Sequence, residues 1–176
     1  YLKLSKEIYE KNTLRNQLAQ LPVDPTFELI NVEFSQTGKR VVEAVTNGEP
    51  LFVSVRYKVK ESVRGLRVFV DVRDESGMLI LRTFHDENND DIPEMHPGEY
   101  ESILTIPEGI FAPKDYVISI HSGIYNKRYS LPEEGINFPI SVIQTSGYNR
   151  AYSSDPVRGQ LALVLKWKTF QMSMGK

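Results

Sequence analysis

The 176-residue chain contains no cysteine, which excludes disulfides, thiolate nucleophiles and cysteine-based zinc sites together. A cysteine-free chain suits a reducing compartment, so we expect the cytoplasm. An excess of positive charge is also missing, because 21 Lys and Arg stand against 23 Asp and Glu for a net charge of -2. Proteins that bind phosphate backbones need such an excess, so no nucleic-acid partner is expected. No apolar run approaches the roughly 20 residues that a membrane-spanning helix requires.

The common catalytic motifs are absent as well. The histidines at positions 85, 96 and 121 do not have the H-x-x-x-H spacing of a zinc site. No serine stands in a G-x-S-x-G elbow, and no G-x-x-x-x-G-K loop is present to hold phosphates. We therefore expect a non-catalytic protein without a cofactor. A polysaccharide-modifying enzyme stays open as an alternative, because a carboxylate pair about 5 to 10 Å apart across a cleft cannot be recognised in a sequence.

Two patterns of apolar residues divide the chain near Pro25. The first 20 residues contain neither Pro nor Gly, and their apolar side chains recur at helical spacing. This spacing loses its phase at Asn12, which predicts two short helices or one interrupted helix. Pro22 and Pro25 disfavour helix in the residues before them. We expect a helical connector over residues 1–25 and a β domain over residues 26–176.

Beyond Pro25 the apolar residues alternate with polar ones, which is typical of strands with one buried face. The odd-numbered residues of Leu51–Val59 are apolar, as are the even-numbered residues of Leu66–Arg73. Asp74–Gly77 then predicts a hairpin turn. The predicted strands are Phe27–Phe34, Leu51–Val59, Leu66–Arg73, Met78–Phe84, Glu99–Ile106, Asp115–Ser122, Ile136–Ile143 and Gln160–Lys168.

Short strands separated by Gly, Pro, Asn and Asp, without a strong interior helix, predict an all-β fold. With one apolar face on each strand, two antiparallel sheets can pack together as an immunoglobulin-like β-sandwich. A domain of this length buries enough surface to be stable without disulfides.

The acidic segment His85–Asp91 has three interpretations. Asp86, Asn88 and Asp90 match the first, third and fifth positions of a calcium loop. The match fails at the sixth position, where Gly is needed for the turn, and at the twelfth, where Pro97 replaces a bidentate Glu. A solvated turn, a looser calcium site and a ligand-facing loop stay open.

The outward face of the strands 66–73, 78–84 and 115–122 is the candidate binding site. Phenylalanine is unusual on an exposed strand face, and here it stands beside planar Arg and Asp side chains. A sugar site uses such a combination, because a ring packs against C–H bonds while charged groups bind hydroxyls or acids. Alternatively, the rings are covered by the N-terminal helix, a loop or a partner, and the charged residues are cross-strand pairs. The candidate carbohydrate-binding residues are Arg67, Phe69, Asp71, Arg82, Phe84, His121 and Tyr125.

A polar stretch from Gln144 to Arg158 is longer than a normal connection between strands of a sandwich. It could carry binding residues, or it could let Gln160–Lys168 complete the sandwich of a second chain. Trp167 in this last strand is expected in a core or an interface.

Several turn and packing motifs follow one another in a recognisable order. They are Asn47-Gly48-Glu49, Asp74-Glu75-Ser76-Gly77, Pro97-Gly98-Glu99-Tyr100 with Ile106-Pro107, Phe111-Ala112-Pro113-Lys114-Asp115-Tyr116, and Val157-Arg158-Gly159 leading to Trp167. With them, about residues 26 to 170 resemble the C-terminal carbohydrate-binding domain of Wzt-type polysaccharide ABC-exporter ATPase subunits. Two features depart from the family: Ala112 to Asp115 stand where a Gly before the Tyr is usual, and the His85–Asp91 segment is unusually acidic. The sugar's identity therefore does not carry over.

The resemblance implies cytoplasmic recognition of a lipid-linked O-antigen or similar polysaccharide, often through a modification at its non-reducing end, before export. It also implies a homodimer, in some members with exchange of the final strand, here residues 160–168. Residues 1–25 would then be the connector from a missing N-terminal ATPase domain. Through that domain the protein would contact the transmembrane exporter subunit at the inner membrane.

On this hypothesis the candidate residues have different roles. Phe69 or Phe84 would supply the apolar platform, and Asp71 and His121 would contact hydroxyls. An acidic or modifying group would be read by Arg67, Arg82 or Tyr125. The competing hypothesis is a structural dimerisation module of the exporter ATPase, in which the phenylalanine-bearing face packs on its twin or on the ATPase domain and no sugar binds.

Overall fold

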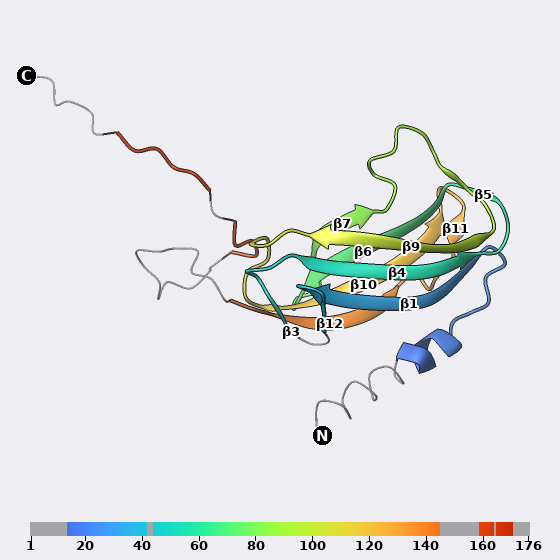
Figure 1. Ribbon diagram of the computed structural model, residues 1–176, viewed down its shortest axis with the longest axis horizontal. Coiled ribbons are helices and arrows are strands. Elements are labelled where there is room, and N and C mark those ends of the chain that lie inside the picture. Colours follow the sequence, from blue (N-terminus) through green and yellow to red (C-terminus); the bar gives the residue numbers. More distant parts are fainter. Residues whose placement is uncertain (1–13, 42–43, 145–158, 164, 171–176) are drawn as a thin grey trace, which may run out of the picture.

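The computed structural model describes residues 14–41, 44–144, 159–163 and 165–170. In this part of the chain the strands are β1 (Phe27–Gln36), β2 (Lys39–Val41), β3 (Ala44–Thr46), β4 (Leu51–Val59), β5 (Val63–Arg64), β6 (Leu66–Asp74), β7 (Leu79–Phe84), β8 (Glu94–Met95), β9 (Gly98–Ile106), β10 (Asp115–Ile124), β11 (Arg128–Tyr129) and β12 (Ile136–Ile143). All of them except β5 and β8 form two packed sheets (Figure 1).

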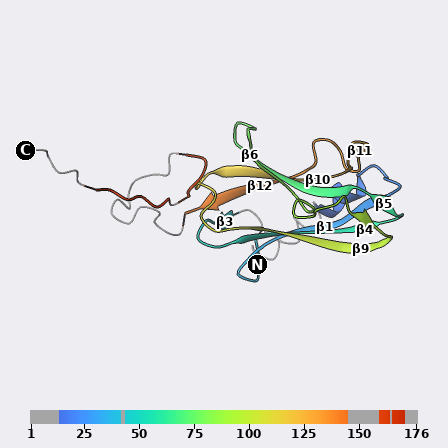
Figure 2. The ribbon, with the colours of Figure 1, turned by 90° about the horizontal axis from the view of Figure 1, so that it is seen from above.

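The four-stranded sheet has the order β2-β1-β4-β9, and the six-stranded sheet has the order β3-β12-β10-β6-β7 with β11 paired to β10. A separate two-stranded ladder joins β5 and β8. Figure 2 shows β6, β10 and β12 in one layer and β1, β4 and β9 in the other. The predicted all-β sandwich is confirmed. The one departure from antiparallel pairing among these strands is β3, which runs parallel to β12.

The core lies between the sheets and follows the alternation in the sequence. On β4 the odd-numbered residues are buried, and on β6 the even-numbered residues from Leu66 to Val72 are buried. Each buried aliphatic side chain of this kind contributes about 1.5–3 kcal/mol of hydrophobic free energy, which conformational entropy largely offsets. The opposite side chains of β6 therefore point away from the core, onto the outer face of the six-stranded sheet.

Seven of the predicted strands are present, with ends that shift by two residues at most. Strands β2, β3, β5, β8 and β11 were not predicted. Each of them has only two or three residues, which is too short for a period of two to be visible.

The predicted strand Gln160–Lys168 is wrong for the residues of this segment that the structure describes. Leu161 forms one isolated bridge with Phe111, and the other described residues of the segment belong to no strand. Its large apolar side chains in the described residues are exposed, Leu163 at 51% and Trp167 at 87%, whereas Ala162 is buried. Residues 165–170 lie away from both sheets in Figure 1. Gln160 and Ala162 exchange backbone hydrogen bonds with Ala112 and Ile110, so the segment pairs with its own chain only at its start. Trp167 is not in this chain's core.

The described part of the connector, residues 14–25, rests on the sandwich. Residues 14–19 are helical, and Leu18 and Leu21 pack against the core. Asp24 then accepts hydrogen bonds from the backbone N–H groups of Thr26 and Phe27, where β1 begins. None of the helices in the described residues is long and apolar enough to cross a bilayer. The expectations for residues 1–13 and for residues 145–158 of the polar stretch lie outside the described residues.

Candidate functional site

The candidate residues gather on the outer face of the six-stranded sheet. The pairing of β6 with β7 and β10 places Phe84, Phe69 and His121 in one row across the strands. The neighbouring row contains Arg82, Asp71 and Ser119 in the same way. Cross-strand neighbours on one face are close enough to touch, so the registers bring these side chains together.

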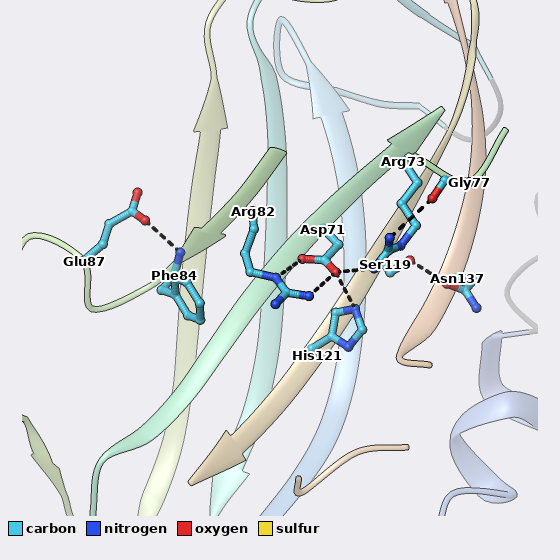
Figure 3. Close-up of polar contacts among 9 residues, drawn as sticks. All are labelled: Asp71, Arg73, Gly77, Arg82, Phe84, Glu87, Ser119, His121 and Asn137. Atoms are coloured by element: carbon cyan, nitrogen blue, oxygen red, sulfur yellow. Dashed lines mark hydrogen bonds and ion pairs between the residues drawn. The ribbon is translucent and has the colours of Figure 1, made fainter. Parts of the chain in front are cut away.

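Asp71 is the centre of a network of ionic contacts (Figure 3). Arg82 donates from Nε to Oδ1 at 2.6 Å and from Nη2 to Oδ2 at 2.7 Å, which is the bidentate geometry that arginine and carboxylate favour. Arg73 donates to Oδ2 at 3.0 Å. Burial favours the protonated acid, but the hydrogen bond from Arg82 and the surrounding positive charge hold the pKa of Asp71 below its ordinary value. Asp71 is therefore a charged and fully satisfied group beneath two arginines.

Phe69 is the middle ring of an aromatic stack. Its centroid lies 4.8 Å from that of His121, with the planes 7° apart, and 5.1 Å from that of Phe84. The guanidinium carbon of Arg82 lies 5.3 Å from the centre of the Phe69 ring. Stacked rings and a covering cation leave Phe69 buried, although it is on the outer side of its strand.

His121 is buried because the segment before β12 lies over it. Gly135 has a φ of +71° and approaches so closely that an added Cβ would lie 2.7 Å from Cε1 of His121. His121 Nε2 is 3.5 Å from Asp71 Oδ2. Burial lowers the pKa of the imidazole more than the nearby Asp71 raises it, so His121 is neutral at neutral pH.

Arg67 repeats the arrangement of Arg82 on the next row of the sheet. It donates from Nε to Asp86 Oδ1 at 2.9 Å, and its guanidinium carbon lies 3.7 Å from the centre of the Phe84 ring. Asp86, the first position of the calcium-loop pattern, is thus engaged with an arginine. Within the described residues no group of three His, Cys, Asp or Glu side chains is placed to hold a metal ion.

A depression of about 560 Å³ opens between these arginines and the hairpin that joins β10 to β11. Its lining residues are Arg67, Phe69, Arg82, Phe84, Gly123, Ile124, Tyr125, Asn126, Lys127, Arg128 and Tyr129. No Asp or Glu is among these lining residues, so the carboxylate pair of a glycosidase does not face across this depression.

The hairpin depends on two small adaptations in the sequence. Asn126 takes the left-handed conformation with a φ of 54°, which asparagine tolerates better than most residues. Gly123 has no side chain, and a Cβ there would lie 2.9 Å from the carbonyl oxygen of Arg128. Sequence reasoning missed Lys127, Arg128 and Tyr129. The signal available was an asparagine turn residue with a tyrosine on either side.

The structure divides the predicted residues into an exposed and a buried group. Phe69, Asp71 and His121 are buried, so they do not face solvent as an apolar platform and hydroxyl contacts were expected to. Arg82 and Tyr125 are exposed, and Arg67 and Phe84 are half-buried at the surface of the depression. The buried group holds the arginines in position, and the exposed group is available to a ligand.

A second opening lies at the side of the sandwich, between β7 and β9. It has a volume of about 390 Å³ and reaches the core valines Val53, Val55, Val68 and Val70. These two strands end their sheets, because β9 pairs with β4 and β7 pairs with β6. The sandwich is therefore open along this edge.

The fold is similar to the crystal structure of the C-terminal domain of Wzt. The TM-score is 0.65 at 8% sequence identity, covering 85% of this chain and 87% of that chain. Lower scores relate the chain to a Niemann-Pick type C2 protein from Japanese carpenter ant, with a TM-score of 0.47, 9% identity and coverage of 70% and 98%. A CARDB domain from Pyrococcus furiosus, in complex with di-metal ions, has a TM-score of 0.42, 16% identity and coverage of 70% and 99%. No protein-family model and no curated protein matches the sequence. The first similarity shows a shared fold.

Proposed function

We propose that the chain is a non-catalytic recognition domain that selects a lipid-linked O-antigen or similar polysaccharide for an ABC exporter, by the modified non-reducing end of the glycan. The observation that supports this most is the depression of about 560 Å³, where exposed aromatic rings and oriented arginines meet on one face. The shared fold with the C-terminal domain of Wzt and the sequence motifs that resemble the same family point to the same function.

In this proposal the tyrosines and the arginines contact different parts of the sugar. Tyr125 and Tyr129 are about half exposed and offer ring faces to the C–H bonds of a sugar. Arg67 and Arg82 offer guanidinium N–H groups, held in direction by Asp86 and Asp71. For a short epitope we expect a dissociation constant between millimolar and micromolar, or about 4 to 8 kcal/mol.

The direct test is a glycan array probed with the 176-residue chain and with a Tyr125→Ala, Tyr129→Ala double variant. We expect the chain to bind glycans with a bacterial polysaccharide end group, and we expect the double variant not to bind them. The melting temperature should not change, because both rings are at the surface. Ile143→Ala serves as a control, since this side chain is exposed on β12 and does not line the depression. If the chain binds no glycan on the array, the proposal is contradicted.

The proposed assembly is a homodimer in which residues 160–168 are exchanged. Leu161, Leu163, Leu165 and Trp167 form an alternating apolar row that is exposed in a single chain. The open side between β7 and β9 offers two unpaired strand edges and an apolar opening to such a segment. Adding a strand to an exposed edge satisfies backbone hydrogen bonds and buries alternate side chains.

Light scattering after size-exclusion chromatography tests the exchange. The chain should be dimeric, and a Leu163→Glu, Leu165→Glu double variant should be monomeric because two charges would enter the apolar row. Lys166→Glu is the control, since it places its charge on the alternate side of the segment. An unchanged dimer in the double variant would argue against exchange. A dimer that binds no glycan would instead favour the structural dimerisation module.

The placement of the domain in the cell follows from the same proposal. Residues 1–25 would join the sandwich to a missing ATPase domain, and through it to the transmembrane exporter subunit on the cytoplasmic side of the inner membrane. The packing of Leu18 and Leu21 on the core supports a fixed position for the described part of the connector, residues 14–25. Fractionation of the full-length protein should place it with the inner membrane only when the transmembrane subunit is present.

A further inference from the structure

The charged side chains that line the depression are all positive, although the chain as a whole has a net charge of -2. Arg67, Arg82, Lys127 and Arg128 line it, and no carboxylate is among its lining residues. The nearby Glu87 lines the opening between β7 and β9, and its carboxylate accepts a hydrogen bond from Thr83 Oγ1. It also accepts one from the backbone N–H of Phe84, as Figure 3 shows.

The carboxylates that pair with the arginines lie behind them. The side chain of Arg82 is 41% exposed and that of Asp71 is 0% exposed. Arg67 at 25% covers Asp86 at 10% in the same way, and Arg128 at 38% covers Asp24 at 9%. Each ion pair therefore presents its positive partner to the depression and its negative partner to the protein.

The ion pairs leave some N–H donors of these arginines unused. Arg82 uses Nε and Nη2 on Asp71, and Arg67 uses Nε and Nη2 on Asp86. A guanidinium has five N–H donors, so in both residues the Nη1 group lies outside the pair. Lys127 forms no ion pair with the residues that the structure describes, and it adds an ammonium at the edge of the same depression.

The lining consequently offers many donors and few acceptors. A sugar hydroxyl is both donor and acceptor. The side-chain acceptors in this lining are the amide oxygen of Asn126 and the hydroxyls of Tyr125 and Tyr129, whereas Asp71 is buried and Asp86 nearly so. A carboxylate or phosphate has only acceptor oxygens at neutral pH and matches arginine forks in geometry and charge. Tyr125 and Tyr129 stand beside the cations, where the ring of a sugar carrying such a group would lie.

From this arrangement we infer that the depression binds an anionic substituent, a carboxylate or a phosphate, carried by a sugar. The inference rests on the proposed function and narrows its ligand class. Arg67 and Arg82 are the specificity-determining residues for the anion, and Lys127 adds long-range attraction.

The experiment compares matched acidic and neutral probes on the 176-residue chain. Glucuronic acid and glucose 6-phosphate are titrated against glucose and followed by NMR shifts of the Tyr125 and Tyr129 rings. An array of glycans with uronate, phosphate and neutral end groups is probed in parallel. We expect at least tenfold preference for one of the anionic forms over its neutral counterpart, and weaker binding as salt is raised. The preferred anion distinguishes carboxylate from phosphate.

The matched variants are Lys127→Glu and Lys39→Glu. Both exchange an exposed lysine and change the net charge equally, but Lys39 is on β2, at the edge of the other sheet. Lys127→Glu should weaken anionic binding at least tenfold, and Lys39→Glu should leave it within twofold. Both variants should fold, because neither lysine is buried.

The outcomes separate the two proposals. Binding of neutral glycans with equal or greater strength than anionic ones would overturn the inference and leave the proposed function standing. Equal effects of the two lysine variants would also overturn it, because they would place the anion elsewhere. Retention of no glycan at all would overturn both.

Discussion

Arg128 in β11 donates hydrogen bonds to both carboxylate oxygens of Asp24, a residue 104 positions earlier in the chain. Oδ1 of the same carboxylate accepts from the backbone N–H groups of Thr26 and Phe27, each at 2.9 Å. Burial favours the protonated acid, but the hydrogen bonds from Arg128 and from the two N–H groups lower the pKa of Asp24 below its ordinary value. One side chain thus joins the connector, the start of β1 and the edge of the depression.

Substitutions at Asp24 should separate these contacts. Asp24→Ala removes the acceptor of two buried N–H groups, so we expect a loss of about 2 to 4 kcal/mol in the free energy of unfolding. Asp24→Asn keeps an acceptor oxygen and loses the charge, and it should cost about 1 kcal/mol. Urea denaturation measures both. An equal cost for the two variants would show that the ion pair, and not the backbone contacts, dominates.

Phe69 and Tyr129 should respond in opposite ways to truncation, although both belong to the candidate site. Phe69→Ala opens a cavity within the aromatic stack and should destabilise the domain by about 3 to 5 kcal/mol. Tyr129 is half exposed, so Tyr129→Ala should change stability by about 0.5 kcal/mol or less and act on binding instead. Thermal unfolding and glycan retention are measured on both variants. A stable Phe69→Ala variant would contradict the burial of this ring.

Gly135 should be the least replaceable glycine beside the site. Gly135→Ala would cost about 1 to 3 kcal/mol for the left-handed backbone alone, and the new Cβ would also clash with His121 and the Ile120 carbonyl. Gly109→Ala is the control, because its φ of +74° is similar and nothing lies within 4 Å of an added Cβ. The difference in urea midpoint between the variants measures the clash. Equal midpoints would mean that the segment over His121 moves freely.

The burial of neutral His121 predicts a pH dependence of stability. Its pKa is lowered in the folded state, so below the ordinary value of about 6.5 the unfolded chain binds more protons than the folded one. The free energy of unfolding should therefore fall as the pH drops below about 6.5, until the folded-state pKa is reached. Urea denaturation between pH 5 and pH 8 measures this, and His121→Gln should reduce the slope. An unchanged slope in that variant would assign the effect to other groups.

The sequence was informative wherever one face of a strand is buried. Alternation located β4, β6 and β10, and the same alternation named residues on the opposite face, including Arg67 on β6 and His121 on β10. Pairing rules predict that these residues share a surface, and the observed register confirms it. A period of two shows which residues of a strand face the core and, by the same alternation, which face outward.

The same pattern could not show which outward residues are covered. Phe69 is buried by a cation bending over it and by neighbouring rings, and His121 by a segment that returns through Gly135. These are contacts between distant parts of the chain and depend on side-chain direction. The hairpin with Lys127 was missed for a different reason, because β11 has two residues and no period. In the segment 160–168 the pattern was present, but among the described residues only Gln160 to Ala162 pair with another segment, the one around Phe111.

Trp167 is the only tryptophan of the chain, and it is 87% exposed in the C-terminal segment. In a single chain its fluorescence emission should have the long wavelength of a hydrated indole and should hardly change when the sandwich unfolds. Unfolding of the sheets would be followed by circular dichroism or by the nine tyrosines instead. The emission of Trp167 therefore reports on what packs against the C-terminal segment. A shift of this emission to shorter wavelength with increasing protein concentration would indicate association of the chains without an added label.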